Sequence, residues 1–325
     1  MPEQTVASLS NFEEPCSGDD GESVPLTHRA GTSQRGLAEI LIADYTFPDR
    51  AWLPSGAIVA LLGEFGVASG AARTTISRLA RRGVLENCRQ GRYSWYRLTQ
   101  RHAGYLWSGG GSIAAFTTNS DSWDGWWTLI AFSVPEDESA RRRALRTALR
   151  SWGYAPLYDA VWVSPRVLTP DVRSGLADFG MRSVSVFRAQ HEQLELENDR
   201  NPVQAWDLAG IADQYNAFIR RWSSLLPAIA AGRVTGAAAV RARTEVVNTY
   251  RHFPAMDPLL PLEFLPPGWP RARAREVCVA VYDGLAQSAQ DFVRAVVAQF
   301  SDTPHPGTRA HTIASMSAGM SHGHA

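Results

Sequence analysis

The segment that most constrains the fold runs from about residue 66 to residue 101. It begins with an amphipathic helical pattern, for which Ser69 is the expected N-cap and Gly83 the stop. On a helical wheel the apolar side chains fall on one side, and hydroxyl and arginine side chains fall on the other. The outward-facing residues that we expect to contact a partner are Arg73, Thr74, Ser77, Arg78 and Arg81.

Two short strands are expected after this helix. Val84 and Leu85 begin the first, and the aromatic residues of WYRLT mark the second. Gly91 allows the turn between them a positive φ. At the tip, Arg92 can enter a minor groove or hold a phosphate, and Tyr93 is a further candidate for DNA contact. A helix, a tight break and a hairpin are the order of a winged helix-turn-helix.

The same window carries a concentrated positive charge. Between Phe65 and Ser120 there are eight arginines, no lysine and one acid, Glu86, which leaves a formal charge of +7 in a chain that is neutral as a whole. Clustered arginine with neighbouring hydroxyls suits phosphates and major-groove base edges. The alternative is an ordinary solvated amphipathic helix. The helix expected before it and the hairpin expected after it favour DNA binding.

Composition excludes several other classes of protein. Three widely spaced cysteines, Cys16, Cys88 and Cys278, form neither a disulfide framework nor a zinc motif and fit a reducing cytoplasm. No apolar run reaches the length of a membrane span. A chain of 325 residues suggests two or three domains.

The chain divides into folded blocks and polar tails. The polar ends are expected to be disordered, although four histidines in the last segment leave a metal-binding tail as an alternative. We expect a disordered extension over 1–32, the winged helix-turn-helix over 33–107, a linker over 108–122, a central domain over 123–194, a helical domain over 195–300 and a disordered tail over 301–325.

The central block has the pattern β-α-β-β-α-β, which is typical of a ferredoxin-like α+β domain. Its first helix is expected to bury Ala144, Leu145, Ala148, Leu149 and Trp152. The arginines of that helix are expected to face outward. Arg141, Arg142 and Arg146 are candidates for binding the phosphates of an effector, and a solvated face is the alternative. The second helix is expected to be capped by Thr169 and stopped by Gly180.

The remaining block has three amphipathic helical segments. NPVQAWDLAGIADQYNAFIRRW, GAAAVRARTEVVNTYRHF and REVCVAVYDGLAQSAQDFVRAVVAQF are each expected to form one helix. The prolines of DPLLPLEFLPPGWP exclude a regular helix there. That segment is too apolar to be freely solvated, so an ordered loop is expected.

Three motifs together resemble the PaaX family of bacterial transcriptional repressors. They are the Arg-Thr-x-x-Ser-Arg-Leu helix from Arg73, the Gly-Arg hairpin with its aromatic strand, and Asp-Pro-x-Leu-Pro followed by Leu-Pro-x-x-Trp from Asp257. The resemblance implies a dimer that binds palindromic operator DNA and is released by an aryl-coenzyme A thioester such as phenylacetyl-CoA. It places DNA contacts at Arg73, Thr74, Ser77, Arg78 and Arg92. It also implies a central domain similar to small CRISPR-associated nucleases, without their activity.

The alternative function is a metal-dependent nuclease on the ferredoxin-like domain. Such chemistry needs carboxylates at the end of the first strand, where the chain offers Glu136, Asp137 and Glu138. Acids at the start of a helix are more simply partners of its dipole. No Ser-His-Asp, Walker or Rossmann pattern is present. We therefore expect a regulator and not an enzyme, with no catalytic residue, cofactor or metal.

Overall fold

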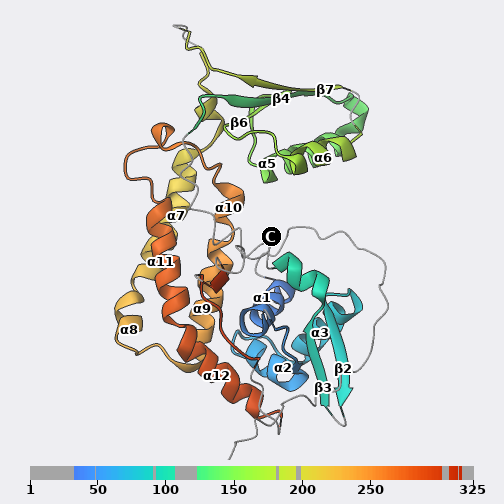
Figure 1. Ribbon diagram of the computed structural model, residues 1–325, viewed down its shortest axis with the longest axis vertical. Coiled ribbons are helices and arrows are strands. Elements are labelled where there is room, and N and C mark those ends of the chain that lie inside the picture. The colour runs from blue at the N-terminus through green and yellow to red at the C-terminus, as the bar shows by residue number, and fades with distance from the viewer. Residues whose placement is uncertain are drawn as a thin grey trace, which may run out of the picture. The chain divides into compact units, whose positions relative to one another are not determined.

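The computed structural model describes residues 33–47, 49–90, 93–106, 123–180, 183–194, 199–301, 307–313 and 315–316 (Figure 1). The chain forms two compact units. The first contains residues 1–103 and 296–307, and the second contains residues 104–295 and 308–325. The expected linker 108–122 and the N-terminal extension 1–32 lie outside the described residues.

Three helices form the core of the first unit. Helix α1 (Gln34–Thr46) is capped by Ser33, whose Oγ accepts a hydrogen bond from the Gly36 amide at 3.2 Å. Helices α2 (Ser55–Gly63) and α3 (Ser69–Arg81) follow. Their apolar faces meet one another, because the side chains at helical spacing are buried on all three. The largest of these buried side chains are Leu41, Ile42, Tyr45, Ile58, Leu61, Leu62, Ile76 and Leu79.

A three-stranded antiparallel sheet completes this unit in the order β1-β3-β2. Strands β2 (Leu85–Gln90) and β3 (Tyr93–Leu98) form the expected hairpin. Strand β1 (Leu53–Pro54) was not expected from the sequence, because its two residues are too short to carry a strand pattern. It pairs with β3 opposite Tyr96 and Trp95, and so ties the hairpin to the start of α2.

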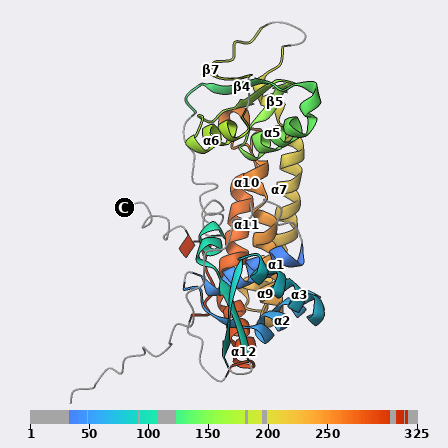
Figure 2. The same cartoon turned by 90° about the vertical axis from the view of Figure 1, so that its right-hand side faces the viewer.

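The second unit contains a four-stranded antiparallel sheet in the order β5-β6-β4-β7. Figures 1 and 2 both show its two helices on the same face of this sheet. The chain order is that expected from the sequence, with α6 capped by the Thr169 hydroxyl. The elements are β4 (Trp127–Ser133), α5 (Ser139–Ser151), β5 (Ala155–Tyr158), β6 (Val161–Ser164), α6 (Pro170–Asp178) and β7 (Ser183–Ala189).

Side chains alternate along β4, so this strand contributes apolar side chains to both faces of the sheet. Ile130 and Phe132 pack under α5 and α6. Trp127 packs on the other face, with Leu260 and Leu265 from the apolar loop of the helical block. The sequence separated the central and helical blocks as two domains. They lie in one compact unit, because the loop and the sheet share a core.

The helical block differs from its expected boundaries at two places. The first expected helix is divided: Pro202–Ala205 form a 3-10 turn, and Asp207 then caps α7. The last expected helix is broken after Gly284, a poor helix former. The elements are α7 (Leu208–Ser223), α8 (Leu226–Ala230), α9 (Gly236–Tyr250), α10 (Phe253–Met256), a 3-10 turn at Leu262–Phe264, α11 (Arg271–Gly284) and α12 (Ala286–Ala298).

The apolar loop is ordered, as expected, around the buried carboxylate of Asp257. This carboxylate accepts hydrogen bonds from the Tyr215 hydroxyl at 2.8 Å and from Nε and Nη2 of Arg271 at 2.7 Å each. Burial, together with the neighbouring carboxylate, raises the pKa of Tyr215. Arg166, which follows β6, donates to the Pro258 carbonyl at 3.1 Å, so the sheet and the loop are also joined by a polar contact.

Part of the expected disordered tail is instead packed on the helical block. Thr308, His311, Ile313 and Met316 are buried. A local polar composition predicts disorder only when no partner surface exists, and here α9, α11 and α12 provide one. Three hydrogen bonds hold the main chain of this segment. Arg294 Nε donates to the Thr308 carbonyl, Arg243 donates to the His311 carbonyl, and the Ile313 amide donates to Asp283.

No helix in the described part of the chain is long and apolar enough to cross a membrane. Cys88 and Cys278 are free thiols, and burial raises the pKa of Cys278. Cys16 lies outside the described residues.

Candidate nucleic-acid interface

Helix α3 presents the outward face that the sequence predicted. Ala72, Thr75, Ile76 and Leu79 are buried. These positions recur at helical spacing, so one stripe of α3 is held against the core. The opposite side is open to solvent, and the exposed residues on it are Arg73, Thr74, Ser77, Arg78 and Arg81.

The start of α3 differs from the expectation. Ser69 is the first helical residue, and the N-cap position is occupied by Ala68, which has no side chain able to accept a hydrogen bond. The main-chain amides of the first turn therefore lack a side-chain cap, and amides in this position are suited to an anion. The end is as expected, because Gly83 has a positive φ of 66°.

The hydroxyl of Thr74 already has a hydrogen-bond acceptor within its own helix. Its Oγ1 donates to the Gly70 carbonyl at 2.9 Å. The single hydroxyl proton is used by this bond, so the lone pairs remain for accepting. Thr74 is consequently available to a partner as an acceptor only, and its methyl group is available for an apolar contact.

The hairpin places its candidate residues unequally. Tyr93 begins β3 opposite Gln90 and is half-buried. Trp95 is buried, so its ring packs the hairpin onto the unit. Gly91 and Arg92 lie outside the described residues, so the expected turn tip stays a prediction.

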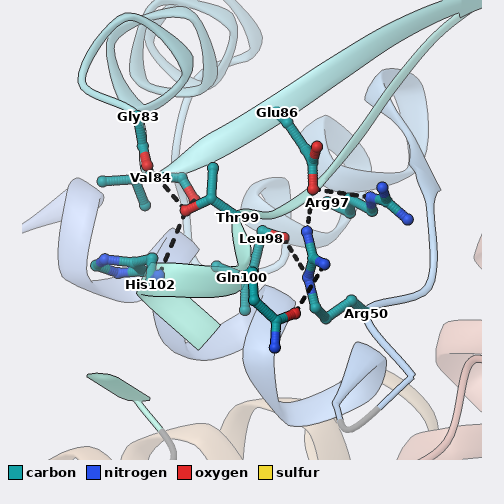
Figure 3. A network of polar contacts seen from close by, with 9 residues as sticks. All are labelled: Arg50, Gly83, Val84, Glu86, Arg97, Leu98, Thr99, Gln100 and His102. Atoms are coloured by element: carbon teal, nitrogen blue, oxygen red, sulfur yellow. Dashed lines mark hydrogen bonds and ion pairs between the residues drawn. The ribbon is translucent and has the colours of Figure 1, made fainter. Parts of the chain in front are cut away.

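An ion-pair network at the base of the hairpin was missed by the sequence reading (Figure 3). The Glu86 carboxylate on β2 accepts a hydrogen bond from Arg97 Nε at 2.9 Å and another from the guanidinium of Arg50. Arg97 also stacks over the Trp52 ring, with its guanidinium carbon 4.4 Å from the ring centroid. A signal for the Glu86–Arg97 pair was present, because the two residues lie directly opposite each other on adjacent strands.

A second polar group lies under α1. Glu39 is buried, and its carboxylate accepts a hydrogen bond from Arg35 Nε at 2.7 Å. His102 Nε2 lies 3.6 Å from the other carboxylate oxygen. Burial by itself would raise the pKa of Glu39, but its contacts with His102 and Arg35 outweigh burial and lower it. This group is a structural connection between α1 and the helix of residues 100–106.

The three arginines proposed for an effector are held by main-chain carbonyls in the structure. A phosphate would have to compete with these bonds. All three are only partly exposed, although the sequence predicted that they face outward, whereas Ala144 is exposed and not in the core. The carbonyl partners are Phe179 and Gly180 for Arg141, Val134 and Pro135 for Arg142, and Asp159 for Arg146.

The acidic segment considered for a nuclease forms a 3-10 turn before α5. Glu138 is paired with Arg141 at 2.6 Å, and Asp137 is exposed. Within the described ranges no group of three or more His, Cys, Asp or Glu residues is arranged to hold a metal ion.

Comparisons with known proteins identify the class. Three family models match along the chain: PaaX-like protein at residues 35–102, the PaaX protein central Cas2-like domain at 120–200, and the PaaX-like protein C-terminal domain at 206–295. The Transcriptional repressor PaaX of Escherichia coli (strain K12) is 30% identical over 251 residues, which are 74% of this chain and 76% of that protein. The protein is thus a transcriptional regulator and not an enzyme. The chain belongs to the PaaX family.

A solved structure shows the same fold. The uncharacterized protein Rv0674 from Mycobacterium tuberculosis matches with a TM-score of 0.54 and 22% identity, covering 82% of this chain and 97% of that one. At this identity the match concerns the fold alone.

Proposed function

We propose that the protein is a repressor that binds operator DNA through a winged helix-turn-helix formed by its first unit. The observation that carries this proposal is the outward face of α3, on which arginine and hydroxyl side chains are exposed. In this arrangement α3 enters the major groove and the β2–β3 hairpin lies along the phosphates. Arg78, Ser77 and Thr74 face base edges, whereas Arg73, Arg81, Arg92 and Tyr93 contact the backbone.

We propose that the repressor acts as a homodimer joined through its ferredoxin-like central sheet. Strand β7 is at the end of the sheet order and pairs only with β4 among the described strands. Val184, Val186 and Phe187 are 38%, 38% and 54% exposed. An exposed apolar edge strand is suited to pairing with another strand. An open groove of about 620 Å³ between β7 and α6 adds further apolar surface.

The dimer is tested by replacing Val186 with aspartate. We expect the variant to sediment as a monomer, because pairing of two β7 strands would bury the new carboxylate in the dimer interface. Leu262→Asp is the matched control, since Leu262 is 70% exposed in a different part of the unit. A Val186→Asp protein that remains a dimer would exclude this surface.

We propose an aryl-CoA thioester as the effector, on the family resemblance stated above. Release requires that the effector bind the DNA-free arrangement more tightly than the DNA-bound one. Arg141, Arg142 and Arg146 remain candidates for its phosphates, in competition with the carbonyls that they hold.

The function is tested by fluorescence anisotropy with duplex DNA from upstream of the coding region of the protein. We expect tight binding that random duplex does not reproduce, reversed by phenylacetyl-CoA but not by free phenylacetate. Binding that ignores the thioester would retain the repressor and reject this effector. Equal affinity for the upstream and random duplexes would count against an operator in that region, and selection from a genomic library would then decide whether the protein prefers any sequence.

A further inference from the structure

A single carboxylate connects three separate parts of the first unit. Glu86 lies on β2, Arg97 lies opposite it on β3, and Arg50 comes from the loop between α1 and β1. Figure 3 shows both guanidinium groups directed at the same Glu86 oxygen. This is the one acid within the basic window of residues 66–119.

The remaining nitrogens of Arg50 hold the end of β3. Its Nε donates to the Leu98 carbonyl and its Nη1 to the Gln100 side chain, each at 2.9 Å. Arg50 has a positive φ of 50°, which is unfavourable for a residue with a side chain. The backbone therefore adopts an unfavourable conformation at the place where this side chain reaches the hairpin.

The network determines which arginines are free to bind phosphate. Arg97 is paired with Glu86 and stacked on Trp52, and Arg50 is paired on the same carboxylate. By contrast, Arg73 and Arg78 on α3 are exposed. The network thus withholds Arg50 and Arg97, whereas the arginines of α3, together with Arg89 and Arg101, stay exposed.

We propose that Glu86 is a positioning residue for operator selection, an inference that rests on the proposed DNA-binding function. Its carboxylate ties the hairpin to the loop between α1 and β1 and keeps Arg50 and Arg97 from phosphates. Without it, the two arginines bind DNA backbone of any sequence, and the hairpin no longer has one orientation. Selectivity falls while sequence-independent binding rises, because backbone contacts carry no sequence information.

The test compares Glu86→Gln with wild type on operator and random duplexes over a range of salt concentrations. We expect the ratio of operator to random affinity to fall about tenfold in the variant. We also expect the slope of log affinity against log salt on random DNA to become more negative by about 1 to 2, since each added phosphate contact contributes about 0.9. Glu64→Gln, which removes the same charge from the end of α2, controls for net charge.

Two further measurements separate positioning from folding. Glu86 is 35% exposed, and partly exposed ion pairs add little stability, so the thermal midpoint of Glu86→Gln should stay close to that of wild type. Adding Arg97→Gln to Glu86→Gln should return the salt slope part of the way to its original value. Unchanged selectivity and slope in Glu86→Gln would overturn the inference while wild-type operator binding stands. A wild type without sequence preference would overturn the DNA-binding function on which the inference rests.

Discussion

Replacing Arg78 with alanine is expected to weaken operator binding by about 1–3 kcal/mol, which raises Kd about fivefold to 150-fold. Arg78 is exposed on the outward face of α3, on the side of the helix opposite the buried Ile76. A guanidinium fork binds two acceptors of a guanine edge at once, and alanine removes both bonds without disturbing the buried face. Anisotropy with operator and random duplexes measures the change.

Comparing the loss of affinity on operator DNA with the loss on random DNA distinguishes a base contact from a charge effect. A base contact predicts that Arg78→Ala loses much more affinity for operator than for random DNA, whereas Arg73→Ala loses affinity for both and makes the salt slope shallower by about 0.9. Arg143→Ala is the control, because Arg143 is an exposed arginine on α5 in the other unit. If Arg78→Ala binds operator as tightly as Arg143→Ala does, α3 is not the reading helix.

Replacing Asp257 with alanine is expected to lower the free energy of unfolding of the second unit by about 3–5 kcal/mol. The carboxylate is buried and accepts hydrogen bonds from the Tyr215 hydroxyl and from two nitrogens of Arg271. Its removal leaves the Arg271 guanidinium, which is only 12% exposed, without the charge that compensates it. Denaturant unfolding monitored by tryptophan fluorescence measures the loss.

An exposed ion pair provides the comparison for Asp257. Glu245 on α9 pairs with Arg221 at 2.5 Å, and both side chains are more than two-fifths exposed. Glu245→Ala should therefore cost less than about 1 kcal/mol. Similar unfolding energies for the two variants would mean that the buried pair contributes no more than a surface pair.

The elements that the sequence predicted well are those specified by local periodicity. Buried and exposed positions on α3 follow from a 3.6-residue repeat. Helix α6 begins after its predicted cap, Thr169, and ends before its predicted stop, Gly180. The cap at Ser69 was wrong by one residue, because cap geometry depends on the backbone of the preceding segment and not on residue type alone.

Contacts between distant segments could not be predicted in the same way. Arg50 and Glu86 are 36 residues apart, and Arg243 and His311 are 68 apart. No local pattern marks such pairs. The arginine-rich helix shows the difficulty directly, because its charges were read as a free outward face, whereas several of them hold neighbouring carbonyls.

Composition, motifs and the helical repeat were enough to predict the α+β class, the family, and the apolar and basic faces of α3. Three features follow only from the three-dimensional fold: the central sheet and the helical block form one unit, residues 308–313 pack on that block, and Glu86 holds two arginines at the hairpin. The partners of a residue in a core or an ion pair depend on which distant segments the fold brings together. The order of amino acids within one helix or strand does not specify those segments.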